Sequence, residues 1–175
     1  MSTPTVNIRR LDRIDEAEIR GLSDVLIDCV NGGASVSFMW PMTEEKAHNY
    51  WRGVAASVAN GERLVFVAED AEGILGTATI VLDQPENQPH RGDLAKMLVH
   101  RRGRRRGVGA ALLVAAEQVA RAAGKTLLVL DTASPDAERL YARNGWVRCG
   151  VIPEYAMLPD GQLCETILYY KKLVD

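Results

Sequence analysis

The segment at residues 101–109 combines residue types that bind phosphate. It reads RRGRRRGVG and lies between an apolar, strand-like run and an alanine-rich, helix-like run. Glycine lets the backbone approach a ligand closely, and the free N–H groups of a first helical turn bind anionic oxygens. Arginine adds forked donors that match phosphate. The segment therefore predicts a phosphate or pyrophosphate site, with a solvated charge cluster at a helix start as the alternative.

Two widespread types of phosphate-binding loop differ from this segment: it lacks the ending of the first and matches the second only in part. A Walker A loop needs a Gly-Lys-Ser or Gly-Lys-Thr ending, which is absent. A dinucleotide-binding turn of Rossmann type is closer, because Gly107 and Gly109 open a helix and Asp131 ends the next strand about twenty residues on. Leu112, however, stands where that turn needs a third small residue. A Rossmann-type oxidoreductase therefore remains an alternative at this point.

The elements that must position this loop follow from hydrophobic periodicity and capping residues. The predicted strands are residues 5–10, 64–69, 74–82, 93–99, 126–130, 146–151 and 164–172, and the predicted helices are residues 19–30, 43–58, 108–123 and 134–143. Thr43 and Ser134 are expected to cap their helices, and the run at 126–130 is typical of a strand buried on both faces. The order βααβββαβαββ predicts a mixed α/β sheet with helices on both faces.

Composition and charge narrow the class of protein. A chain of 175 residues, with 47% hydrophobic and 25% charged residues, predicts one globular domain over residues 1–175. The net charge of −2 gives no overall attraction for nucleic acid or anionic lipid. The three cysteines are an odd number, and the three histidines show no ligand spacing, so we expect reduced thiols and no metal. Without a leader-like or membrane-length apolar run, a cytoplasmic protein without membrane contact is expected.

Two motifs, in order, resemble those of the GCN5-related N-acetyltransferases. Residues 104–109, RRRGVG, are similar to the Q/R-x-x-G-x-G/A pyrophosphate loop of that superfamily. Residues 137–146, AERLYARNGW, are similar to its A-x-x-L-Y-x-x-x-G-F segment. The resemblance covers about residues 5–172, and Ser134 departs from it because many members have Asn there. It implies the superfamily's α/β fold, a mixed and mostly antiparallel central sheet with one splayed parallel strand pair and helices on both faces.

The sequence also resembles one subgroup of this superfamily. Residues 31–39, NGGASVSFM, look like a segment of the tabtoxin-resistance acetyltransferases, as do residues 130–132 and 152–161. Members of that subgroup acetylate the amine of an amino-acid-like β-lactam toxin. The resemblance thus implies an enzyme that transfers acetyl from acetyl-CoA to a small-molecule amine, with an amino-acid-like toxin or antibiotic as one candidate acceptor. Acetylation of a protein amine is the alternative.

The resemblance implies a binding site for acetyl-CoA, which acts as co-substrate. Backbone groups of the strand end would pair with the pantetheine arm, and the loop and the following helix start would hold the pyrophosphate. The residues implied are Met97, Leu98, Val99, Arg104, Arg105, Arg106, Gly107, Val108, Gly109 and Ala110, with Ser134 as a further cofactor contact.

Catalytic roles are implied for one tyrosine and two carboxylates. Tyr141 resembles the family tyrosine that protonates the departing thiolate, with a core aromatic as the alternative. Asp131 and Asp93 lie on the two strands expected to splay apart, so each is a candidate general base. Asp131 could instead anchor the acceptor's ammonium group, and Asp93 could be a turn residue at its strand's start. The acceptor pocket is expected to include Ser35, Phe38, Trp40 and Tyr155. For Phe38 and Trp40 the alternative is packing beneath a long loop.

Two other classes of protein, a binding module and a nucleic-acid-binding protein, fit the sequence less well than an enzyme does. A binding module that keeps the fold but not the chemistry would be expected to lack Tyr141 or the loop glycines, and both are present. A nucleic-acid reader would show aromatics among the arginines of residues 101–106, and there are none. We therefore expect a small-molecule amine and no nucleic acid as partners. The sequence leaves open whether the protein is a monomer or a homodimer.

Overall fold

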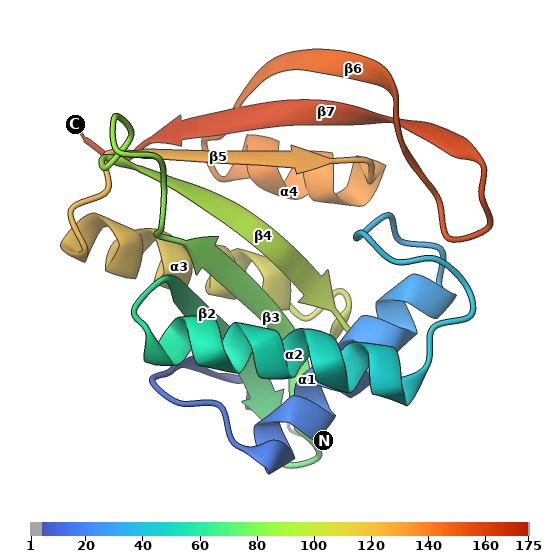
Figure 1. The fold of residues 1–175 in the computed structure, drawn as a ribbon. Helices are drawn as coiled ribbons and strands as arrows, with labels where there is room; N and C mark the ends of the chain where they lie inside the picture. Colours follow the sequence, from blue (N-terminus) through green and yellow to red (C-terminus); the bar gives the residue numbers. More distant parts are fainter. Residues whose placement is uncertain (1–4, 175) are drawn as a thin grey trace.

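The computed structural model describes residues 5–174, so residues 1–4 and 175 of the expected domain lie outside it. Its elements follow the predicted order, with one added 3₁₀ turn (Figure 1). They are β1 (Asn7–Leu11), α1 (Glu16–Asn31), α2 (Glu44–Ala59), β2 (Arg63–Asp70), β3 (Gly73–Val81), β4 (Arg91–Val99), η1 (Arg101–Gly103), α3 (Val108–Ala122), β5 (Leu127–Thr132), α4 (Pro135–Arg143), β6 (Val147–Met157) and β7 (Leu163–Lys172).

Local chemistry explains where the helices begin. Thr43 accepts a hydrogen bond from the Lys46 N–H and caps α2, as predicted. Ser134 caps α4 in the same way, and Pro135 stands at its first position, where a missing N–H is harmless. Asp15 and Glu18 form a capping box at the start of α1. These side chains satisfy N–H groups that have no partner within the helix.

The seven strands form one sheet in the order β1-β2-β3-β4-β5-β7-β6. Every neighbouring pair is antiparallel except β4 and β5, which are parallel. That pair is joined only where residues 91–93 face residues 127–129, and the two strands then diverge (Figure 1). The predicted mixed sheet with a splayed parallel pair is confirmed. The Rossmann alternative is wrong, because that fold needs a mostly parallel sheet.

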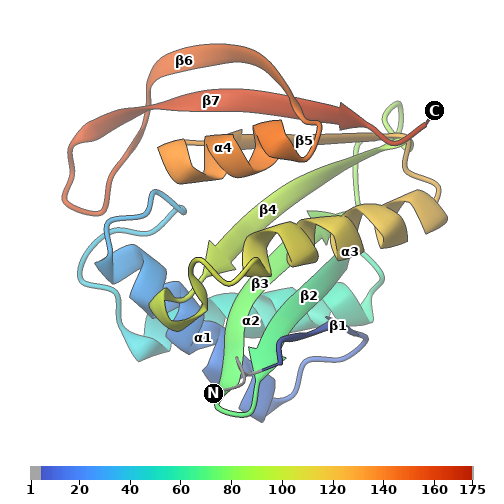
Figure 2. The same cartoon turned by 180° about the vertical axis from the view of Figure 1, so that it is seen from behind.

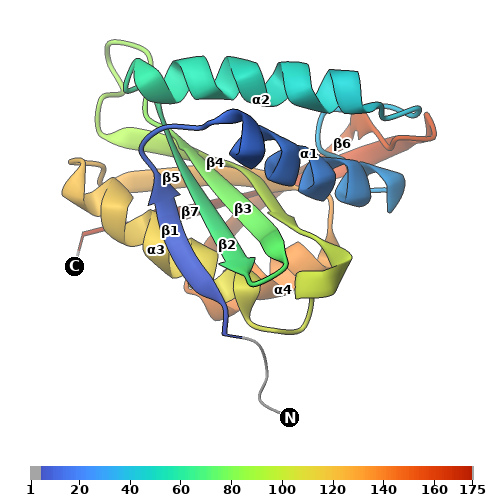
Figure 3. The same cartoon turned by 90° about the horizontal axis from the view of Figure 1, so that it is seen from below.

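Helices cover the sheet on both sides. Figure 3 shows α1 and α2 on one side and α3 and α4 on the other, and Figure 2 shows the second pair from the front. Two hydrophobic clusters result: one places α3 and α4 against the sheet around Leu112 and Leu128, and the other places α1 and α2 against it around Leu22 and Trp51. Within residues 5–174, no helix is both long enough and apolar enough to cross a bilayer.

The prediction that β5 is buried on both faces is wrong. Leu128 and Leu130 are buried in the cluster under α3 and α4, but Leu127 and Val129 are only half-buried and Asp131 is exposed. The reason is that α1 and α2 pack on β2, β3 and β4. The face of β5 on their side of the sheet is therefore left partly open, next to the point where β4 and β5 separate.

Candidate active site

The divergence of β4 from β5 leaves a strand edge without a partner strand. Beyond Asp93 no residue of β4 pairs with β5, so Met97, Leu98 and Val99 lie on an edge where an extended ligand can add as a further strand. On its other side β4 pairs with β3, with a register shift between Thr77 and Thr79. Lys96 takes up the extra residue of this bulge and has φ of 50°. The edge has the form that the pantetheine prediction requires.

The glycine-rich turn leads from this edge into α3. Gly107 is the N-cap of α3 with φ of 73°, and no side chain caps the helix. The amide of Ala111 is bonded to the Gly107 carbonyl, so the preceding amides of the first turn have no partner within the helix. A Cβ on Gly107 would meet no atom within 4 Å. The turn therefore offers open N–H groups at the positive end of a helix, which suits a pyrophosphate.

The arginines of the loop do not share one role. Arg106 donates to the Asp70 carboxylate at 3.0 Å, and this hydrogen bond holds the pKa of Asp70 below its ordinary value. Arg106 thereby fastens the loop to the β2–β3 hairpin, which the phosphate prediction did not include. Arg101 is held by Asp28 of α1. Arg104 and Arg105 are exposed, and the Arg104 side chain also contacts Cys29 and Gly32 at the end of α1. Binding of a phosphate by these two arginines stays a prediction.

Gly109 has a packing contact in addition to its predicted place in the phosphate loop. A Cβ at this position would lie 3.0 Å from Cδ2 of Leu140 on α4. The glycine thus lets α3 lie close to the Leu140 side chain of α4, and the place of Gly109 in the phosphate loop stays a prediction. Gly107, with its left-handed backbone, is the glycine that the loop conformation needs.

Tyr141 lies on α4 beneath the point of divergence. Its side chain is 4% exposed, and its ring packs at 5.7 Å from Trp146 and 5.9 Å from Tyr169 between ring centres. Burial, and then the negative charge of Asp131, raise the pKa of Tyr141 well above its ordinary value. The phenol therefore keeps its proton throughout the neutral range, as a group that protonates a thiolate must.

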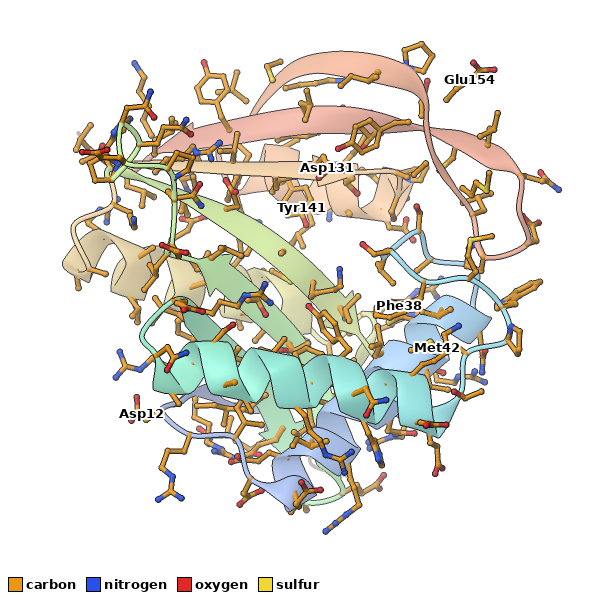
Figure 4. The ribbon with its side chains drawn as sticks, in the orientation of Figure 1. Asp12, Phe38, Met42, Asp131, Tyr141 and Glu154 are labelled. Atoms are coloured by element: carbon orange, nitrogen blue, oxygen red, sulfur yellow. The ribbon has the colours of Figure 1, made fainter. Side chains whose placement is uncertain are left out.

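Asp131 ends β5 on the open side of the sheet. Thr166 of β7 donates a hydrogen bond to its Oδ2 at 2.7 Å, and no other donor within residues 5–174 contacts this carboxylate. Figure 4 labels Asp131 and Tyr141 in the same region of the view, and Asp131 lines one pocket together with Phe38. The carboxylate is thus held in one orientation with its second oxygen available to a ligand.

A pocket of about 240 Å³ opens beside Asp131. Three of the residues predicted to contact the acceptor line it, namely Ser35, Phe38 and Tyr155. The sequence analysis missed its further lining residues, which are Ser37, Met39, Thr132, Ala133, Ala156, Met157, Glu165 and Thr166. The loop after α1, the end of β5 and the β6–β7 pair all contribute residues to the lining of this pocket.

Two predicted site residues lie elsewhere, and a third caps a helix. Trp40 is 49% exposed, and its indole N–H donates to the Val30 carbonyl, so it fastens the loop to α1 instead of lining the pocket. Asp93 lies where β4 and β5 are still paired, with its carboxylate bonded to the Gln84 amide. Ser134, which was predicted as a cofactor contact and not as a pocket residue, caps α4 through its side chain. The direction of the strands explains the position of Asp93. Because β4 and β5 are parallel, Asp93 near the start of β4 is level with Val129 and not with Asp131 near the end of β5.

Lys96 and Tyr50 join this site without having been predicted. Lys96 Nζ lies 3.3 Å from the Ser37 hydroxyl and 5.5 Å from the centre of the Tyr50 ring. The only signal in the sequence was a lysine in an otherwise apolar part of the predicted strand at 93–99. Among residues 5–174 no group of three or more His, Cys, Asp or Glu side chains is placed to hold a metal ion.

The comparisons with known proteins point to one family. Residues 61–148 match the family model described as Acetyltransferase (GNAT) domain. A protein of Azospirillum brasilense, described as an uncharacterized N-acetyltransferase in the hisH-hisA intergenic region, is 31% identical over 128 residues, which are 72% of this chain and 74% of that protein.

Solved structures agree in fold. An N-acetyltransferase from Staphylococcus aureus Mu50 superposes with a TM-score of 0.81 over 97% of this chain and 99% of that one, at 17% identity. The putative acetyltransferase yncA from Salmonella typhimurium, solved with its cofactor acetyl-CoA, gives a TM-score of 0.77 over 97% and 95% of the two chains, at 19% identity.

Proposed function

The chain belongs to the GNAT family of acetyl-CoA-dependent N-acetyltransferases, and we propose that its acceptor is the primary amine of a small, amino-acid-like molecule. The observation that carries this proposal is the Asp131 carboxylate, oriented by Thr166 in the lining of the pocket and beside Tyr141. A carboxylate in this position pairs with an ammonium group and brings it to the unpaired edge of β4.

The shape of the pocket supports a small acceptor. Its volume of about 240 Å³ suits a molecule of amino-acid size, and apolar side chains such as Phe38, Met39 and Met157 share its lining with polar ones. The segment at residues 31–39, which resembles that of the tabtoxin-resistance acetyltransferases, supplies one of its walls. An amino-acid-like toxin or antibiotic is therefore the acceptor class that we propose.

The reaction follows from the groups around the pocket. A primary amine with a pKa of about 10.4 is only about 0.1% neutral at pH 7, so it must lose a proton before it attacks the thioester carbonyl. Asp131 holds the ammonium group, and water takes up that proton. The amine nitrogen then forms the new bond to the carbonyl carbon, the bond to sulfur breaks, and the Tyr141 hydroxyl protonates the thiolate.

A panel of amines tests the proposal by the release of free thiol from acetyl-CoA. The panel contains free amino acids, their decarboxylated amines, polyamines, and peptides that carry an N-terminal or lysine amine. We expect the highest kcat/KM with amino acids. Preferred acetylation of the peptides would overturn the small-molecule proposal in favour of a protein amine.

Two matched variants separate the role of Asp131 from a general effect of charge. Asp131→Asn should raise the acceptor KM and leave kcat on its high-pH plateau similar, because the amide cannot hold an ammonium ion. Glu165→Gln removes another pocket carboxylate that no threonine orients, so it should change KM less. A wild-type KM, kcat and pH profile in Asp131→Asn would remove Asp131 from the site.

A further inference from the structure

The side chain of Lys96 lies next to the acceptor pocket, in contact with one of the residues that line it. Its residue forms the bulge of β4 directly before Met97, at the start of the edge that has no strand partner. Its ammonium group reaches the Ser37 hydroxyl at 3.3 Å, and Ser37 lines the acceptor pocket together with Asp131. The chain therefore carries a primary amine of its own at the wall of the pocket.

This amine has no counter-ion in the described part of the chain. Lys96 forms no ion pair with a carboxylate there, and its contacts are the hydroxyl of Ser37 and the face of the Tyr50 ring at 5.5 Å. Burial, and then the positive charge of Arg63, lower the pKa of Lys96, while Asp131 acts in the opposite sense. A half-buried lysine in such surroundings is neutral more often than a solvated one, and the neutral amine is the nucleophile.

The chain also carries the other groups that an acetyl transfer needs. Asp131 lines the same pocket as Ser37, the residue that Lys96 contacts, and its negative charge acts on the pKa of Lys96 and on that of Tyr141. Tyr141 keeps the proton that a departing thiolate takes up. Lys96, Asp131 and Tyr141 thus supply, within one chain, the amine, the carboxylate and the acid that the reaction with an external acceptor uses.

We propose that Lys96 is an internal acetyl acceptor, which takes the acetyl group of acetyl-CoA when the acceptor pocket is empty. The Nζ atom, after losing a proton to water, forms a bond to the thioester carbonyl carbon. The bond from that carbon to sulfur breaks, and the thiolate takes the Tyr141 proton. The products are Nε-acetyl-Lys96 and CoA, and the pocket loses a positive charge and part of its volume. The modified enzyme is consequently expected to turn over external amines more slowly.

This modification is tested by incubating the purified full chain with acetyl-CoA alone. Intact mass spectrometry follows the addition of acetyl groups, and peptide mapping locates them. Lys172, which is exposed at the end of β7, serves as the reference for uncatalysed acetylation of a surface lysine. Because bound acetyl-CoA acts at high effective concentration, Lys96 should react at least about tenfold faster than Lys172. Equal rates, or no acetylation of Lys96, would overturn the proposal.

Variants distinguish catalysed transfer from simple reactivity. Tyr141→Phe should slow acetylation of Lys96 by about a hundredfold and leave Lys172 unchanged, as expected for loss of a general acid. Lys96→Arg keeps the positive charge and should abolish the fast acetylation at this position. Lys96→Met should abolish it as well, and serves as a second variant if arginine distorts the bulge. Acetylation of Lys96 that is as fast in Tyr141→Phe as in the wild type would show chemical reactivity alone and contradict the proposal.

The outcomes remain separate from those of the proposed function. If amines from the panel are acetylated while Lys96 stays unmodified, the small-molecule function stands and the internal acceptor is wrong. If Lys96 is acetylated and no panel amine is, the internal acceptor stands and the acceptor class must be revised. A good external amine should also slow the acetylation of Lys96, because both amines compete for the same acetyl group. If the amine does not slow it, the claim that Lys96 reacts only when the acceptor pocket is empty is wrong.

Discussion

The hydroxyl of Thr166 on β7 donates a 2.7 Å hydrogen bond to Oδ2 of Asp131 at the end of β5. Thr166 is 3% exposed, whereas Asp131 is exposed to the pocket. The two strands are antiparallel neighbours, and the register places Asp131 against Leu168, two residues beyond Thr166. A buried donor on one strand thus sets the orientation of a carboxylate on the next, which links the last hairpin of the chain to the acceptor site.

Removal of this donor should weaken acceptor binding. Thr166→Val keeps the shape of the side chain but loses a hydrogen bond to a charged group, so we expect the acceptor KM to rise about fivefold, equivalent to about 1 kcal/mol. The change in kcat should be smaller. Thr79→Val is the matched control, because the Thr79 hydroxyl is buried without a hydrogen-bond partner. Steady-state kinetics with the best amine of the panel measure both KM values. Equal KM values for Thr166→Val and Thr79→Val would contradict a role of Thr166 in acceptor binding.

Tyr141→Phe should lower kcat by about a hundredfold and leave the acetyl-CoA KM nearly unchanged, because the hydroxyl acts on the leaving thiolate. The raised pKa of Tyr141 gives a further expectation. Its acid form persists above pH 10, where a solvated tyrosine loses its proton, so the wild-type rate should not fall there through this group. Tyr169→Phe, which loses the contacts of the hydroxyl with Glu138 and Arg148, is the control. A kcat within threefold of wild type for Tyr141→Phe would make Tyr141 a packing residue.

The backbone of Gly107 should matter for CoA binding in a way that other left-handed glycines do not. Gly107 and Gly124 flank α3, have φ of 73° and 86°, and each has open space where a Cβ would lie. Replacement by alanine should destabilise the fold by about 1 kcal/mol in both cases. Only Gly107→Ala should weaken the Kd for CoA, by about tenfold or about 1.4 kcal/mol, as calorimetry can measure. Equal Kd values in the two folded variants would remove the pyrophosphate from this loop.

The anchor between α1 and the turn after β4 should contribute to stability. Asp28 is 7% exposed and accepts hydrogen bonds from the backbone N–H and the guanidinium of Arg101. Burial raises the pKa of Asp28, but the bonds from Arg101 and the charge of His100 outweigh it, so the pKa is lowered overall. Asp28→Asn should cost about 2 kcal/mol at pH 7.

The pH dependence of this contribution has a defined sign. A carboxyl with a lowered pKa stabilises the fold above its ordinary pKa of 3.8, and the contribution is lost as the pH falls through the lower, folded value. The difference between wild type and Asp28→Asn in urea denaturation should therefore shrink below pH 3.8. Asp24→Asn, which changes an exposed neighbour of His100, should have little effect at any pH. A difference that grows on acidification would rule out the anchor.

Local signals in the sequence were sufficient to predict the helices and strands. The caps Thr43 and Ser134 and the periodicity of apolar residues depend on interactions within a few residues, and all of the predicted helices and strands are present. Tyr141 and Asp131 were also identified, because one belongs to a recognisable segment and the other directly follows an apolar strand. Their placement beside each other agrees with the predicted roles, which the proposed variants will test.

Contacts between distant segments decided the rest. Arg106 pairs with Asp70, Trp40 with Val30, and Gly109 packs on Leu140, and none of these partners follows from sequence spacing. The same holds for Lys96, which a bulge in β4 turns toward a loop 59 residues earlier. Residue types and periodicity determined which elements form and which chemistry the chain can perform. The register of strands and the packing of helices decided which side chains meet, because burial and hydrogen bonding are satisfied by the whole fold at once.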